Sequence, residues 1–178
     1  MIILRVVIAV LENLPGQIDF ALPKLVGMLL AENKVAFETV DTPPNFRSMV
    51  LQSLSMAIYN SSLTTLGIIE QEQQTFAVFS NWLGFMSEFK LEFEIRRILF
   101  GLLSIIKTPA ASIPQMVQSQ LPEITKQIGG LAFRVHKERM KNLEKNEKYI
   151  AAGFESSDEG EEDSDDDEEI DGEENAGD

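Results

Sequence analysis

Few residues in this sequence have the types and spacing that catalysis or metal binding requires. The sequence has no cysteine and a single histidine, His136, which lies in the run RVHKER. His136 lies among cations and no carboxylate is fixed beside it, so we expect an exposed residue on a helix surface. Gly129-Gly130 is followed by Leu and Ala and does not form a phosphate-binding loop. The sequence therefore predicts neither an enzyme nor a bound cofactor.

Carboxylates are the chemically distinctive groups, and they are concentrated at the end of the chain. Residues 155–178 contain fifteen Asp or Glu residues and no Lys or Arg, whereas all 15 cations and the other 14 acids precede Glu155. The formal net charge of −14 therefore divides into a body at +1 and a tail at −15. Asp165-Asp166-Asp167 resembles a metal-binding cluster, but a flexible polyanion does not fix coordination geometry, so we expect no specific metal site. Acidic blocks of this kind are typical of interaction tails, and we expect residues 151–178 to be disordered.

A flexible strand with a charge at about every second residue imitates a nucleic-acid backbone, so it can bind histones or ribosomal proteins without fixed contacts. The carboxylates that we expect to contact basic protein cargo are Glu155, Asp158, Glu159, Glu161, Glu162, Asp163, Asp165, Asp166, Asp167, Glu168, Glu169 and Asp171. Ser156 and Ser164 each have an acid three residues later and are candidate sites for an acid-directed kinase. A tail that only keeps the protein soluble is the alternative.

A stretch rich in cations precedes the tail and is a candidate docking site for it. Its cations are Arg134, Lys137, Arg139, Lys141, Lys145 and Lys148. The alternatives are a solvated final helix and a site for an acidic partner protein. Direct nucleic-acid binding is not expected, because the neighbouring polyanion competes for the same cations.

The elements that position these residues are predicted to be helices. Apolar residues recur at helical spacing almost everywhere before residue 150, and no segment alternates as a strand does. The expected helices cover residues 2–11, 18–29, 45–57, 63–69, 74–89, 91–106 and 114 onward, with a loop over residues 33–44. We expect Pro23 to kink the second helix, and Pro122 with Gly129-Gly130 to kink or break the last one.

About four helix pairs in residues 1–150 give a period of about 38 residues, which is typical of HEAT repeats. The predicted fold is therefore an all-α, HEAT/armadillo-like solenoid segment, with an irregular helical bundle as the alternative. Residues 74–89 and 91–106 each carry two apolar faces, so we expect both helices to pack on two sides. The aromatic residues between 76 and 100 are expected in the core, with the lining of an exposed groove as the alternative. Of Arg96 and Arg97, one is expected to face solvent and the other to pair with an acid or a carbonyl.

The distribution of apolar residues adds two expectations. The longest apolar run is about ten residues, about half of what a membrane span needs, so we expect no membrane insertion. The chain opens on apolar sequence without the polar cap that solenoids need, which predicts a C-terminal piece of a longer helical array. The alternative is that the first helix caps itself or packs on a partner chain.

The order of the elements resembles the C-terminal HEAT repeats of the importin-beta superfamily, in the importin-seven and importin-eight class. The resembling features are a helix end at Ala57–Tyr59, a short leucine helix, a helix with Phe79, Trp82 and Leu83, and a helix from Arg96-Arg97 to Gly101-Leu102. A proline-bearing loop, a final helix and an acidic, serine-dotted tract follow in the same order. The resemblance covers about residues 46–170.

This resemblance implies a nuclear transport receptor that shuttles between nucleus and cytoplasm and passes the nuclear pore in the nuclear envelope. In that family the superhelix binds basic cargo such as ribosomal proteins and histones, makes weak contacts with phenylalanine-glycine nucleoporins, and releases cargo when Ran-GTP binds. In members of that family the Ran-binding repeats lie near the N-terminus of the protein, so this segment is not expected to bind Ran itself. The alternatives are a free-standing acidic-tailed chaperone for basic proteins and a HEAT scaffold subunit of an enzyme complex.

Overall fold

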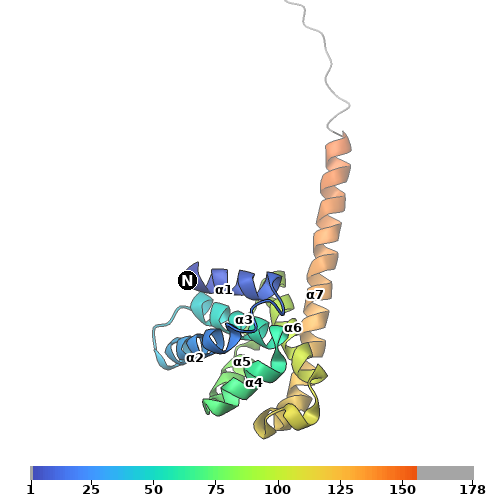
Figure 1. Cartoon of the computed structure of the whole chain (residues 1–178). Helices are drawn as coiled ribbons and strands as arrows, with labels where there is room; N and C mark the ends of the chain where they lie inside the picture. The colour runs from blue at the N-terminus through green and yellow to red at the C-terminus, as the bar shows by residue number, and fades with distance from the viewer. Residues whose placement is uncertain (1, 156–178) are drawn as a thin grey trace, which may run out of the picture. The chain divides into compact units, whose positions relative to one another are not determined.

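The structure, a computed structural model, describes residues 2–155, and for residues 151–155 it describes the backbone alone. Across these residues the chain is helical and contains no strand, which confirms the all-α prediction (Figure 1). The chain divides into two units, Met1–Arg139 and Met140–Asp178. Apart from the helix backbone up to Glu155, the tail predicted over residues 151–178 lies outside the described residues.

Seven α-helices and two 3₁₀ helices account for most of residues 2–155. The α-helices are α1 (Ile2–Asn13), α2 (Leu22–Glu38), α3 (Pro44–Asn60), α4 (Ser62–Gln71), α5 (Thr75–Gly84), α6 (Glu92–Lys107) and α7 (Gln115–Glu155). The 3₁₀ helices are η1 (Met86–Glu88) and η2 (Ala110–Ser112). Each of the seven predicted helices is present, but the one expected over residues 74–89 ends at Gly84 and is followed by η1.

Pro23 marks the start of a helix rather than a kink. It lies in the first turn of α2, where a residue without an N–H group loses no helical hydrogen bond, so the prediction of a kink is wrong. α2 begins at Leu22 and continues to Glu38, through half of the expected loop over residues 33–44. Pro44 is likewise the first residue of α3.

α7 is continuous from Gln115 to Glu155, so the break expected at Pro122 or Gly129-Gly130 is absent. Pro122 removes one backbone hydrogen bond, and each glycine costs about 1 kcal/mol relative to alanine. Val117, Ile124 and Leu131 of the same helix are buried on either side of these residues. Their burial stabilises the helix through the positions where propensity alone predicts an interruption.

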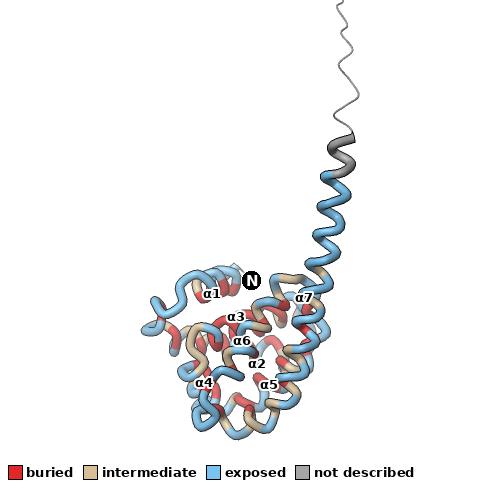
Figure 2. The backbone as a smooth tube through the Cα atoms, turned by 90° about the vertical axis from the view of Figure 1, so that its right-hand side faces the viewer, coloured by how far each residue is buried: buried red, intermediate tan, exposed pale blue. Residues whose placement is uncertain are grey.

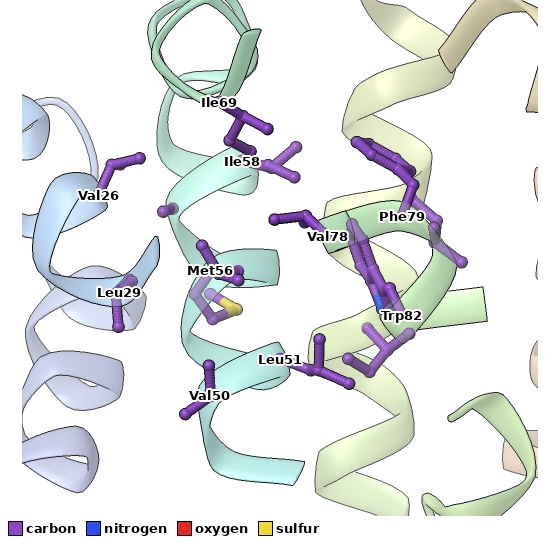
Figure 3. Packing of buried hydrophobic residues seen from close by; sticks show 14 of the residues in the cluster. Val26, Leu29, Val50, Leu51, Met56, Ile58, Ile69, Val78, Phe79 and Trp82 are labelled. Atoms are coloured by element: carbon purple, nitrogen blue, oxygen red, sulfur yellow. The ribbon is translucent and has the colours of Figure 1, made fainter. Parts of the chain in front are cut away.

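α3 is the central helix of the unit Met1–Arg139. It packs against α1, α2, α4 and α6, and most extensively against α6. Every residue from 48 to 58 is buried, so neighbouring elements enclose α3 on all sides (Figure 2). Val26 of α2 and Val78 and Trp82 of α5 face α3 from opposite sides (Figure 3). The core of this unit is therefore arranged around a single helix.

Several of the buried side chains of α3 are polar, and each of the serines has a partner. The Ser53 hydroxyl donates to the carbonyl of Met49 at 2.7 Å, within α3 itself. The Ser55 hydroxyl donates to the carbonyl of Arg97 in α6, also at 2.7 Å. A buried hydroxyl without a partner would cost about 1–3 kcal/mol, so these bonds are what allows polar residues on a fully enclosed helix.

The prediction of two buried faces holds for residues 74–89 and fails for α6. Both apolar stripes of residues 74–89 are largely buried, with the exception of Phe76, which is 72% exposed. In α6, one face is buried, whereas Phe93, Phe100 and Leu103 on the other remain partly exposed. Among the described residues, Tyr59 stacks on Phe100 at 5.3 Å, but no helix covers the whole of this face. The reason is that α3 packs along one side of α6 only.

Candidate protein-binding surfaces

A polar network joins three helices of the unit Met1–Arg139. Oε1 of Glu94 in α6 accepts hydrogen bonds from the Ser48 hydroxyl at 2.8 Å and from Nε2 of Gln52 at 3.2 Å. Nη1 of Arg97 donates to Oε1 of Gln52 at 3.1 Å. Nη2 of Arg97 donates to Oε2 of Glu12 in α1 at 2.8 Å. The network therefore links α1 and α3 to α6 through charge-assisted bonds, the stronger kind.

The other carboxylate oxygen of Glu94 caps α6. Oε2 accepts the backbone N–H groups of Lys90 and Leu91, each at 3.1 Å. Because the Leu91 side chain has no acceptor, Glu94 alone provides side-chain capping at this helix start. Both oxygens of Glu94 are thus used within the fold, and this carboxylate is not available to a partner protein.

A groove of about 450 Å³ opens beside the network. Its walls come from α1, α3 and the start of α6: Arg5, Ile8, Ala9, Asn45, Met49, Gln52, Leu91, Phe93, Glu94 and Arg97. The guanidinium of Arg97 lies over the Phe93 ring, 5.2 Å from its centre. Phe93 therefore lines a groove, which is the alternative given above for the aromatic residues between 76 and 100. A mostly apolar wall with a few polar groups is typical of sites that take a side chain of a partner.

Two charges at this groove, those of Arg5 and Glu94, have no ion-pair partner within residues 2–150. Arg5 is exposed, and Glu94 accepts hydrogen bonds from neutral donors only, so its carboxylate keeps a negative charge. Arg97 is paired with Glu12. The charges of the groove therefore do not select a basic partner, and we do not assign the predicted basic cargo to it.

A second hollow, of about 410 Å³, lies between α2 and the start of α5 and is polar. Asn33 at its wall is 1% exposed, and its Oδ1 has no hydrogen-bond partner among the described residues. Glu38 and Glu72 also line the hollow, together with Lys34, and none of the three forms an ion pair within residues 2–150. Glu38, Glu72 and Lys34 together carry a net charge of −1, which suits a cationic side chain, whereas the Asn33 oxygen is buried. Sequence reasoning missed this hollow, because its residues come from segments about 40 positions apart.

The predicted tail-docking cations do not share one environment. Arg134 is partly buried, and its guanidinium donates to the backbone carbonyls of Met86 and Phe89. These bonds hold α7 to η1 and leave Arg134 occupied. The other five (Lys137, Arg139, Lys141, Lys145 and Lys148) are exposed and form no ion pair within residues 2–150.

His136 is exposed, as predicted. Arg96 is exposed and Arg97 pairs with Glu12, which confirms the predicted division of roles between the two arginines. Of the carboxylates predicted to contact cargo, Glu155 has a described backbone at the end of α7. The others lie outside the described residues, as do the candidate phosphorylation sites Ser156 and Ser164.

No three His, Asp or Glu side chains among residues 2–150 gather as metal ligands would. No helix within the described residues combines the length and the apolar composition needed to cross a membrane. Comparisons with profiles of known protein families, with curated proteins and with solved structures find no match.

Proposed function

We propose that this chain is a C-terminal segment of an importin-type nuclear transport receptor, whose acidic tail contacts basic protein cargo. The observation that carries the proposal is the separation of charge along the chain. Residues 155–178 hold fifteen carboxylates and no cation, while the preceding residues are almost neutral. Such a segment attracts histones and ribosomal proteins through its total charge and does not need a matched surface.

The packing order of the helices supports a HEAT-like arrangement of the unit Met1–Arg139. α1 packs on α3, and α3 packs on α6, so these three helices form a row. α2 packs on α4 and also on α3. In a stack of helix pairs, the first helices of neighbouring pairs touch one another, and so do the second helices. We therefore propose that α1, α3 and α6 are the first helices of successive pairs.

The proposed tail acts at short range. A disordered chain of 24 residues, the state that the sequence predicts for residues 155–178, would have a root-mean-square span of roughly 27 Å, enough to follow the surface of a bound cargo. Charges are screened over about 8 Å at physiological ionic strength, so the carboxylates act only near contact. The affinity for basic cargo is therefore expected to fall as salt is added.

The test is a binding measurement on the full chain with purified histones. In one variant, the fifteen acids of residues 155–178 are replaced by Asn and Gln. In the matched control, the same residues are shuffled, so that charge is kept and order is lost. We expect the neutral tail to weaken binding at least about tenfold and the shuffled tail to bind as the unmodified chain does. Unchanged binding by the neutral variant would remove the role given to the tail.

A second measurement separates a carrier from a free-standing chaperone. An importin-type segment should be retained on a resin of phenylalanine-glycine repeat peptides, while a chaperone of basic proteins has no reason to bind it. Histone binding without retention on this resin would support the chaperone and overturn the transport assignment.

A further inference from the structure

The part of α7 that belongs to the second unit carries an apolar stripe without a cover. Every residue from 140 to 150 is exposed (Figure 2). Met140, Leu143 and Ile150 are 45%, 54% and 66% exposed. Phe133, one heptad before Met140 on the same helix, is 68% exposed. Large apolar side chains in such a row are typical of a helix that has a partner.

The stripe has the spacing of a coiled coil. Phe133 and Met140 are seven residues apart, Leu143 follows three residues later, and Ile150 follows after another seven. These are the a and d positions of a heptad repeat, which keeps one seam facing a second helix. Glu147 occupies the remaining a position and His136 the remaining d position.

This stripe is not a continuation of the face that packs in the core. The buried residues of α7 are Val117, Ile124 and Leu131, which also follow a seven-residue spacing. The same spacing continues to Glu138 and Lys145, which are charged. The apolar positions therefore move to another face of the helix after Leu131, and that face needs a different partner.

Most helices in proteins owe their stability to the tertiary packing of an apolar face. The second unit contributes residues 140–155 to α7. A second helix along the stripe would supply the packing that these residues lack among the described part of the chain.

The charged residues beside the stripe indicate which helix packs against it. Arg139 lies at a g position and Glu144 at the e position five residues later, and neither forms an ion pair within residues 2–150. In a parallel pair, each g residue faces the e residue of the next heptad on the other helix. Two copies of this helix would thus form Arg139–Glu144 pairs on both sides of the seam. An antiparallel pair with Met140 against Ile150 would instead bring the two Glu144 carboxylates together.

We propose that residues 133–154 of α7 form a parallel two-stranded coiled coil with a second copy of this chain. Met140, Leu143 and Ile150 of both copies form its seam, and Arg139 pairs with Glu144 across it. Glu147 faces its own counterpart, which weakens the dimer but disfavours slipped registers, as a polar a residue does in other coiled coils. This proposal does not rest on the transport function.

Cross-linking tests the seam and its direction, because the chain has no cysteine. Leu143→Cys in the full chain should form a disulfide-linked dimer in a glutathione redox buffer, since parallel d residues face each other. The matched control Lys145→Cys, at an f position two residues away, should still dimerise but should not become disulfide-linked. Equal cross-linking of the two variants, or none by Leu143→Cys, would overturn the proposal. Cross-linking of Leu143→Cys only to Glu147→Cys in a mixture would show antiparallel helices and also overturn it.

Sedimentation gives an independent readout. The mass of the unmodified chain should rise from 19.9 kDa towards twice that value as its concentration increases. Glu147→Leu replaces the one charged a residue of the seam and should lower the dimer dissociation constant at least about tenfold. Glu138→Leu adds the same side chain at an f position and should leave the dissociation constant unchanged. A monomer in all three proteins, or an equal effect of the two substitutions, would contradict the proposed seam.

Discussion

Gly101 of α6 lies directly against Ser55 of α3, and the two backbones approach more closely there than a side chain on residue 101 would permit. A Cβ atom built on Gly101 would be 2.8 Å from the carbonyl oxygen of Ser55 and 2.9 Å from its Cα. The Ser55 hydroxyl also bonds to the carbonyl of Arg97, one turn before Gly101. The most extensive helix contact of the fold thus depends on a residue without a side chain.

Gly101→Ala should destabilise the protein by about 2 kcal/mol, because the added methyl group pushes α6 away from backbone atoms that cannot move independently. Urea unfolding followed by circular dichroism measures this change. Gly67→Ala in α4 is the matched control, since no atom lies within 4 Å of its added Cβ. That substitution should stabilise the helix by about 0.5–1 kcal/mol. Equal unfolding midpoints for the two variants would show that α3 and α6 do not meet at Gly101.

Glu94→Gln should destabilise the protein by about 2 kcal/mol. The substitution replaces one carboxylate oxygen, which accepts from side chains or backbone N–H groups, with an amide nitrogen that only donates. Glu92→Gln removes the same charge from the same helical turn, and Glu92 makes no side-chain hydrogen bond among the described residues. Its effect should be about 0.5 kcal/mol. Thermal unfolding of both variants tests this, and similar losses would mean that only the charge near the helix start matters.

Arg97→Met should loosen α1 from the rest of its unit. Arg97 bonds to Glu12 of α1 and to Gln52 of α3, and both bonds disappear in the variant. Hydrogen exchange of the α1 amides should become about fivefold faster, which corresponds to about 1 kcal/mol for a partly exposed pair. Arg96→Met, at the exposed neighbouring position, should leave exchange in α1 unchanged. Unaltered protection of α1 in Arg97→Met would show that apolar packing alone holds this helix.

Gln127→Ala should raise the pKa of Glu123. Nε2 of Gln127 donates to the Glu123 carboxylate at 2.6 Å, and this bond is the main reason that the pKa of Glu123 is lowered, with Lys126 as a weaker contributor. A lowered folded pKa means that the bond favours folding above the ordinary glutamate pKa and that this contribution is lost as the pH falls through the folded value. A carboxyl NMR titration measures the pKa. Lys126→Ala should shift it less, and a larger shift for Lys126→Ala would reverse the assignment of causes.

The helices could be predicted because their apolar periodicity is a local property of the sequence. α4 and α6 match the expected ranges within two or three residues. Proline was the main source of error, because Pro23 starts a helix and Pro122 is tolerated inside one, and the choice depends on burial around it. The enclosure of α3 could not be predicted, because Ser48 and Ser55 have partners that lie more than 40 residues away.

The candidate surfaces also include features that the sequence alone predicts and features that only the fold creates. The exposure of His136 and the different roles of Arg96 and Arg97 follow from local charge and periodicity, and the structure confirms them. The groove beside Phe93 depends on three helices that only the fold brings together. The use of Arg134 by backbone carbonyls has no signal in its own neighbourhood, where it looks like any other cation of the basic stretch.

The central place of α3 has a consequence for the order in which the chain is made. The hydroxyl of Ser48 can donate to Glu94 only after a further 46 residues have been synthesised. A ribosome therefore releases α3 well before α6 can cover it. The side of α3 that α6 covers in the folded protein includes Ser48, Gln52 and Ser55. During synthesis this side shows hydroxyl and amide groups to water instead of a purely hydrocarbon surface, which lessens the risk that unfinished chains aggregate.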